Sequence, residues 1–161
     1  MLTVTDRHTI RAGLSAVFRC VWDAELWPKI TSHVKRVSFL EATDRSQKML
    51  MTVVANGAEH TVESLREAEP DRHIRYRQTR PPAFLETHDG EWRFTAVPEG
   101  VRVDLVHRAV VDYDKALPAL NVGTPAEADR LISSTLKTNG SRTLIAIKDY
   151  LERQGDDAAR S

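Results

Sequence analysis

Residues 101–111 read VRVDLVHRAVV, and this stretch is the most direct indication of the fold. Every second residue from Val101 to Val111 is apolar except for one histidine, His107. Side chains of a β-strand alternate between two faces, so the pattern predicts a long strand whose buried face includes an imidazole. A buried imidazole needs a polar partner or a hydrated cavity. The strand by itself favours a core histidine bonded to a neighbouring strand, and a pocket residue is the alternative.

Five further extended segments precede this strand and are separated by short runs of turn residues. They lie at about 34–42, 48–55, 59–67, 73–79 and 86–97. A short strand at about 4–11 and two short helical stretches, at 15–22 and around Trp27-Pro28, come before them. Strands in direct succession with short turns predict an antiparallel sheet.

A long helix closes the chain. The sequence Thr124-Pro125-Ala126-Glu127 is typical of a capping box with proline at the first helical position, and an apolar stripe continues from there to about Arg153. Gly140 lies in the helix interior, where glycine costs about 1 kcal/mol relative to alanine. We therefore expect either close packing on the sheet or a cavity beneath the helix at this point. Residues 154–161 are small and polar, which predicts a frayed tail.

The composition fits one domain, at residues 1–153, of a chain of 161 residues. Lys plus Arg and Asp plus Glu both number 23, so no overall field favours nucleic acid or an anionic membrane. Cys20 is the single cysteine, which excludes an internal disulfide and a cysteine-based zinc site and fits a reducing compartment. The first residues are charged and no apolar run approaches about 20 residues. These features predict a cytoplasmic protein without a membrane segment.

Together the elements predict an α+β helix-grip architecture: a curved antiparallel sheet of about seven strands, two short helices after the first strand, and a long C-terminal helix. Four motifs mark it in order: Val21-Trp22-Asp23 through Trp27-Pro28, ESLR at 63–66, IRYRQ at 74–78 and GEWRF at 90–94. On these motifs the chain, from about Asp6 to Glu152, resembles the polyketide aromatase/cyclases of the START-like (Bet v 1-like) superfamily, in particular the monodomain enzymes of bacterial type II pathways. The resemblance implies a deep pocket between sheet and helix.

The resemblance also implies which residues carry the chemistry. It places the even positions of the strand at 59–67 inward, so that Ser64 and Arg66 face the pocket, although the strand by itself favours a solvated arginine. Arg66 could then bind a keto or enolate oxygen and stabilise negative charge as it develops. His107 matches a pocket histidine thought to transfer protons, which imidazole can do near neutral pH. The expected catalytic residues are Arg66, His107 and Ser64.

Eight further residues are expected to contact the substrate. They are Trp27, His60, Arg77, Phe84, His88, Trp92, Asn139 and Thr143. Arg77 is placed in the pocket by the resemblance, whereas the alternation of its own strand sends it outward. Thr143 stands where related enzymes carry an aspartate, and a threonine cannot act as a base.

The resemblance implies that the protein directs aldol cyclisation and dehydration of a poly-β-ketone held on an acyl carrier protein, as a monomer or homodimer. It implies no cofactor. His60, His88 and His107 lack the carboxylate or cysteine that would complete a metal site, so no metal is expected. The pocket would hold the flexible chain in one conformation. The alternative is a noncatalytic carrier of a lipid or isoprenoid, and a partner-binding module with a collapsed core would have no cavity.

Overall fold

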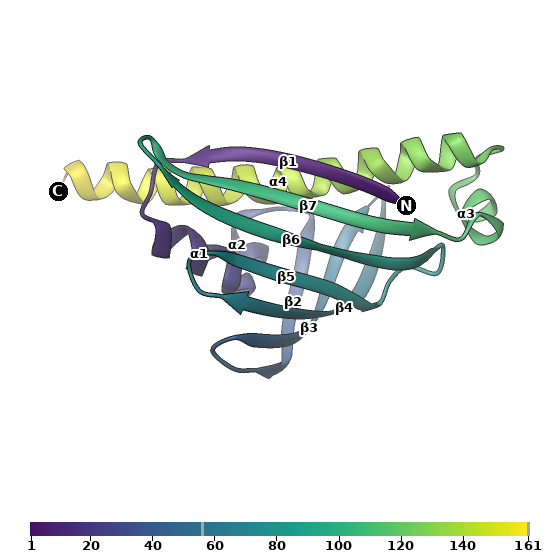
Figure 1. The fold of residues 1–161 in the computed structure, drawn as a ribbon, viewed down its shortest axis with the longest axis horizontal. Helices are drawn as coiled ribbons and strands as arrows, with labels where there is room; N and C mark the ends of the chain where they lie inside the picture. The colour runs from purple at the N-terminus through teal and green to yellow at the C-terminus, as the bar shows by residue number, and fades with distance from the viewer. Residues whose placement is uncertain (56, 161) are drawn as a thin grey trace.

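Among residues 1–55 and 57–160, which the structure describes, a seven-stranded antiparallel sheet curves around one long helix (Figure 1). The structure is a computed structural model. The strands are β1 (Leu2–Ile10), β2 (Val34–Ala42), β3 (Ser46–Ala55), β4 (Ala58–Glu69), β5 (His73–Arg80), β6 (Leu85–Val97) and β7 (Gly100–Val111). The helices are α1 (Leu14–Trp22), the 3-10 turn η1 (Ala24–Leu26), α2 (Trp27–Ile30), α3 (Tyr113–Leu120) and α4 (Pro125–Arg160). The sheet order is β1-β7-β6-β5-β4-β3-β2, so the first strand pairs with the last.

The predicted helix-grip architecture is confirmed, including the two short helices after the first strand. The helix α3 was not expected. It begins after Asp112, whose side chain accepts a hydrogen bond from the backbone N–H of Lys115. Pro118 lies inside this helix, and proline is a residue that usually indicates a helix end.

The helix α4 continues to Arg160, beyond the end expected from the sequence at about Arg153. Contacts with the turn after β1 stabilise this extension. Glu152 accepts a hydrogen bond from the backbone N–H of Arg11 at 3.0 Å, and the Arg11 guanidinium lies 2.9 Å from the carboxylate of Asp156. Ser161 lies outside the described residues.

The start of α4 has the predicted capping hydroxyl of Thr124, while the Glu127 carboxylate bonds one residue before the one expected of a capping box. The Thr124 hydroxyl accepts a hydrogen bond from the backbone N–H of Glu127 at 3.2 Å, and the Glu127 carboxylate accepts one from Gly123 N–H at 3.1 Å. Proline occupies the first helical position, where no N–H is needed. No helix in the described part of the chain is long and apolar enough to span a bilayer.

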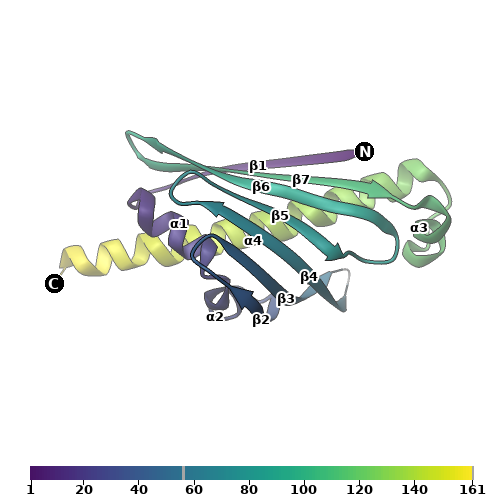
Figure 2. The ribbon, with the colours of Figure 1, turned by 60° about the horizontal axis from the view of Figure 1, so that its bottom comes forward.

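The sheet presents one face to α4, and the alternation of β7 shows which. Val101, Val103 and Leu105 are fully buried, whereas Arg102 and Asp104 between them are partly exposed. The helix α4 runs along the concave face, with α1 and α2 at one end of the molecule and α3 at the other (Figure 2). This arrangement leaves room for a cavity between the sheet and α4.

Candidate functional site

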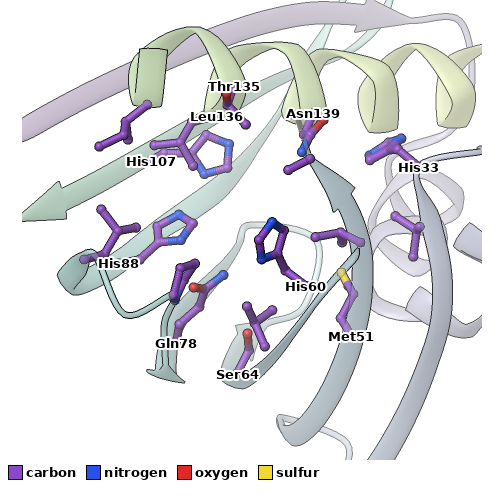
Figure 3. A pocket seen from close by; sticks show the side chains of 18 of the residues that line it. His33, Met51, His60, Ser64, Gln78, His88, His107, Thr135, Leu136 and Asn139 are labelled. Atoms are coloured by element: carbon purple, nitrogen blue, oxygen red, sulfur yellow. The ribbon is translucent and has the colours of Figure 1, made fainter. Parts of the chain in front are cut away.

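A cavity of about 570 Å³ lies between α4 and the inner face of strands β3 to β7. Its wall contains ten of the eleven predicted site residues: Trp27, His60, Ser64, Arg66, Phe84, His88, Trp92, His107, Asn139 and Thr143. Figure 3 shows His88 and His107 on one side of this cavity, His33 on the other and His60 between them. Within the described residues, the cavity therefore brings together side chains from strands β2 to β7.

Arg77 is the predicted site residue that the structure places elsewhere. It is exposed on the outer face of β5, while Tyr76 and Gln78 on either side of it line the cavity. The alternation of this strand sends Arg77 outward, so the placement taken from the resemblance was wrong.

The inward face of β4 is the one expected. His60, Val62, Ser64 and Arg66 all line the cavity. Ser64 is buried at 5% exposure, and its hydroxyl adds a small polar group to this wall.

Arg66 lies at the end of the cavity beside α1, and its guanidinium is hydrogen-bonded to other groups of the protein. Its Nη1 donates to the backbone oxygen of Trp22 at 3.2 Å and to Oε1 of Gln47 at 3.0 Å, and its Nη2 donates to the backbone oxygen of Val21 at 2.7 Å. The guanidinium also lies 5.2 Å from the ring centroid of Trp22 and 5.5 Å from that of Trp27.

These contacts change the interpretation of Arg66. Val21 and Trp22 are the last residues of α1, so the guanidinium caps the carbonyl end of that helix, where a cation is favoured. Burial lowers the pKa of Arg66 to about 9 and Asp23 opposes this shift, so the side chain stays cationic at neutral pH. Arg66 thus ties β4 to α1 and supplies positive charge to one end of the cavity.

Tyr76 links the two histidines on the opposite wall. Its hydroxyl lies 3.0 Å from Nε2 of His88 and within hydrogen-bond distance of Nδ1 of His107. His107 points inward, as the alternation predicts, but its polar partner lies on β5, two strands away, and not on a strand next to β7. Nε2 of His107 is buried and has no hydrogen-bond partner among the described residues.

Burial dominates the protonation of this cluster. Desolvation lowers the pKa of His88 to about 4, against the opposing effect of Asp89. Desolvation and the neighbouring His88 lower the pKa of His107 to about 3. Desolvation also raises the pKa of Tyr76 well above its ordinary value. All three groups are therefore neutral at neutral pH.

Two glycines make room for this cluster. Gly90 pairs with Tyr76 on one side and with His107 on the other. A Cβ at Gly90 would lie 2.0 Å from the backbone oxygen of Val106 and 2.7 Å from the Tyr76 hydroxyl, so only glycine lets Tyr76 cross β6 to reach His107. On the helix side, a Cβ at Gly140 would lie 2.8 Å from Nε2 of His107. The two interpretations of Gly140 both hold, because it packs on the sheet and also lines the cavity.

Thr143 lines the cavity, but its hydroxyl already makes hydrogen bonds to other groups of the protein. It donates to the backbone oxygen of Asn139 at 3.1 Å and therefore accepts from Nε2 of His33 at 3.0 Å. Nδ1 of His33 then accepts from the hydroxyl of Thr31 at 2.7 Å. The threonine that replaces the expected aspartate holds α4 to the loop before β2.

Four polar residues of the cavity wall were missed from the sequence: His33, Tyr76, Gln78 and Thr135. Tyr76 was assigned to the core face, and a buried tyrosine usually needs a partner for its hydroxyl, which is the signal that could have found it. Gln78 lies two residues further on the same face, and its Oε1 is buried without a partner in the described part of the chain. No sequence signal identified His33.

The arrangement combines apolar walls with a few polar groups. Trp27 and Trp92 form an aromatic wall near Arg66, with ring centroids 5.8 Å apart. Four histidines line the cavity, yet no three His, Cys, Asp or Glu side chains within residues 1–55 and 57–160 are grouped to hold a metal ion. The site can therefore bind a flexible apolar chain with polar substituents and exchange a proton with it at His107.

Comparison with known proteins gives a consistent result. A family model described as polyketide cyclase/dehydrase and lipid transport matches residues 1–152. The granaticin polyketide synthase bifunctional cyclase/dehydratase of Streptomyces virginiae is 35% identical over 141 residues, which make up 86% of this chain and 46% of that protein.

Two solved structures superpose over nearly the whole chain. The di-domain ARO/CYC BexL from the BE-7585A biosynthetic pathway matches with a TM-score of 0.87 and 33% identity over 94% of this chain and 50% of its own. The Zhui aromatase/cyclase from Streptomyces sp. R1128 matches with a TM-score of 0.85 and 25% identity over 95% of this chain and 94% of its own. The chain spans about half the length of the granaticin relative and of BexL, and nearly all of Zhui.

Proposed function

Because the chain belongs to the polyketide cyclase/dehydrase and lipid-transport family, we propose that it directs aldol cyclisation and dehydration of a poly-β-ketone in the cavity beneath α4. The observation that carries the proposal is the buried Nε2 of His107, which has no hydrogen-bond partner in the described residues and lies on the wall of an otherwise largely apolar cavity. The relatives named for cyclase/dehydratase or aromatase/cyclase activity support it.

In this proposal His107 transfers the protons. The methylene group between two carbonyls is acidic, so a neutral imidazole can remove its proton, and the resulting imidazolium can protonate the leaving hydroxyl. Because the pKa of His107 is lowered to about 3, the ring is a weak base, and the enolate needs additional stabilisation. The cationic Arg66 at the end of the same cavity supplies a field that favours negative charge on the substrate.

The other polar groups hold the chain. His60, Ser64 and Gln78 come from the sheet and can bind keto oxygens along a folded substrate, while Asn139 approaches from α4. The aromatic wall of Trp27 and Trp92 can stack against the ring that forms. Holding one conformation of a flexible chain allows only one pair of carbons to meet, and this selects the ring that closes.

We further propose that the substrate arrives on an acyl carrier protein and that the protein works as a monomer or homodimer. Pro82, Ala83 and Phe84 of the β5–β6 loop and Leu120 of α3 line the end of the cavity away from α1, which makes this end the candidate entrance. The proposal retains the predicted cytoplasmic location, where the single buried thiol of Cys20 stays reduced.

The second candidate is a noncatalytic carrier of a hydrophobic small molecule. It is favoured by the many aliphatic side chains in the wall, such as Met49, Met51, Val53, Leu105 and Leu136. A carrier needs shape and apolar surface, whereas it has no use for an imidazole nitrogen without a partner.

The test is reconstitution with a minimal polyketide synthase and its carrier protein, with products separated by chromatography and mass spectrometry. The wild-type protein should convert the shunt mixture to one cyclised aromatic product. His107→Asn should lower that product by roughly 100-fold or more while the protein stays folded. Arg77→Ala, on the outer face of the sheet, is the matched control and should behave as wild type. An unchanged shunt mixture with the wild-type protein would refute the cyclase proposal and favour the carrier.

A further inference from the structure

We propose that Tyr76 and His88 form a proton relay behind His107, which stores the proton taken from the substrate and returns it to the leaving oxygen. The inference rests on the proposed function and extends it to two residues that act through His107. It starts from one geometric fact: a single tyrosine hydroxyl bridges two imidazole nitrogens, Nε2 of His88 at 3.0 Å and Nδ1 of His107.

The bridge couples the tautomers of the two rings. A hydroxyl has one proton, so Tyr76 donates to one ring and accepts an N–H from the other. When Tyr76 donates to His107, His88 presents Nε2–H to the hydroxyl and His107 carries its own proton on Nε2. When Tyr76 donates to His88, both rings are protonated on Nδ1, and Nε2 of His107 is a free base. Neutral His88 and His107 must therefore have the same tautomer at the same time.

The second state is the one that can take a proton from the substrate. The C–H bond of the methylene breaks, its electron pair becomes that of the enolate, and the proton moves to Nε2 of His107. The Nδ1 proton of His107 can then move to the Tyr76 oxygen while the Tyr76 proton moves to Nε2 of His88. The positive charge now lies on His88, next to the carboxylate of Asp89, which favours the cation there.

The same transfers in reverse complete each half of the reaction. In the cyclisation, the enolate carbon forms a C–C bond to a second carbonyl carbon, whose π electron pair becomes an alkoxide and takes the returned proton. In the dehydration, a second C–H proton is removed, its electron pair forms a C=C bond as the C–O bond breaks, and the hydroxide leaves as water with the returned proton. Atoms and charges balance without an oxidant, a reductant or a further reactant.

The surroundings of the relay keep it away from solvent and in place. Gly90 leaves open the space that the Tyr76 side chain crosses, and Gly140 has no side chain that would fill the space next to Nε2 of His107. The charged groups that act on the cluster are Asp89 and Arg108, on the two strands that carry the histidines, and Asp6 on β1. A tyrosine in the core for packing alone would not require a glycine on the strand between it and a histidine.

The first test needs no substrate. Histidines labelled with ¹⁵N in the wild-type protein report their tautomers through long-range proton–nitrogen correlation, and His88→Gln and His107→Gln variants assign the two rings. We expect the same tautomer, or the same ratio of tautomers, on both rings at pH 7. Opposite tautomers would require Tyr76 to donate two protons and would overturn the relay. This result is independent of whether the protein proves to be a cyclase.

The second test uses the reconstituted polyketide synthase. Tyr76→Phe should lower the directed product roughly 10- to 100-fold, while binding of an aromatic product, read from quenching of tryptophan fluorescence, changes by less than about twofold. His88→Gln should cause a similar loss, because an amide can hold the hydrogen bond to Tyr76 but cannot carry the proton. Tyr113→Phe removes an exposed hydroxyl bonded to Asp129 and is the matched control, expected to behave as wild type. Full activity of His88→Gln or of Tyr76→Phe would overturn the relay.

Discussion

Replacement of Arg66 by alanine separates a structural from a directly catalytic role for this side chain. In the folded protein its guanidinium donates to the backbone oxygens of Val21 and Trp22 and to Oε1 of Gln47, and the side chain is 2% exposed. The truncation leaves two buried acceptors, the backbone oxygen of Val21 and Oε1 of Gln47, without this donor, whereas the backbone oxygen of Trp22 keeps its hydrogen bond from Nε2 of Gln47 at 3.0 Å. It also leaves an empty space between two indole rings. We therefore expect Arg66→Ala to destabilise the protein rather than only inactivate it.

The magnitude follows from opposing effects. A buried acceptor that loses its partner costs about 1–3 kcal/mol, two are affected, and the lost packing between the indole rings adds to this cost. Removal of the cation also relieves a desolvation penalty of several kcal/mol, which offsets part of this loss. The net expectation is a decrease of about 3 kcal/mol in the free energy of unfolding, a large fraction of the roughly 5–15 kcal/mol typical of a domain.

Urea unfolding followed by circular dichroism measures the effect. Arg77→Ala changes an exposed arginine on the neighbouring strand and should alter the free energy of unfolding by less than about 0.5 kcal/mol. Arg66→Lys should fall between the two, because one ammonium group cannot reproduce the planar fork of the guanidinium. If Arg66→Ala unfolds at the wild-type urea concentration yet loses directed cyclisation, the reasoning is refuted and Arg66 acts directly on the substrate.

Three further outcomes are expected. Gly140→Ala should destabilise the protein by about 1–2 kcal/mol despite the better helix propensity of alanine, because its Cβ would lie 2.8 Å from Nε2 of His107. The control Gly155→Ala, whose Cβ meets nothing within 4 Å, should stabilise the protein by up to about 1 kcal/mol. Equal shifts in melting temperature for the two variants would contradict the predicted clash at Gly140. Acidification from pH 7 to pH 5 should lower the free energy of unfolding by about 2 kcal/mol for each of His88 and His107, since both rings protonate near pH 6.5 once unfolded but have a pKa of about 4 and about 3 in the folded protein. A urea midpoint that does not move between these pH values would show that the rings are not buried in the neutral form. Thr143→Val should lower the free energy of unfolding by about 1–2 kcal/mol through the loss of a buried hydrogen bond and leave the product profile unchanged, so an altered profile would instead place its hydroxyl on the substrate.

The fold could be predicted from the sequence because its elements have strong local patterns. Alternation identified the long strand β7, and Thr124 with Glu127 fixed the start of α4. The inward face of β4 followed from the resemblance, because its own alternation favours neither face. The extension of α4 beyond Arg153 could not be predicted, because it depends on a contact with Arg11, far away in the sequence. The helix α3 was not predicted, because it contains Pro118 and a proline usually indicates the end of a helix.

The site could be predicted in part. Alternation placed His107 inward and Arg77 outward, and the structure follows alternation in both cases. The partners of Arg66 are mostly backbone oxygens, which any sequence possesses, so no residue pattern indicates them. The reach of Tyr76 to His107 depends on the register of three strands with Gly90 between them, which becomes visible only once the sheet is assembled.

The pairing of β1 with β7 has a consequence for how the molecule assembles. Leu2 lies opposite Ala109 and Ile10 opposite Val101, so about a hundred residues must be synthesised before the first strand finds its partner. Such distant contacts slow folding, because a long loop must close before they are made. Until then the apolar inner surface of the sheet has neither its edge strand nor its covering helix. In the newly made chain the wall of the future cavity is therefore an exposed apolar surface for a time. The topology of the sheet makes the chain prone to aggregation during that time, so protection from aggregation is needed.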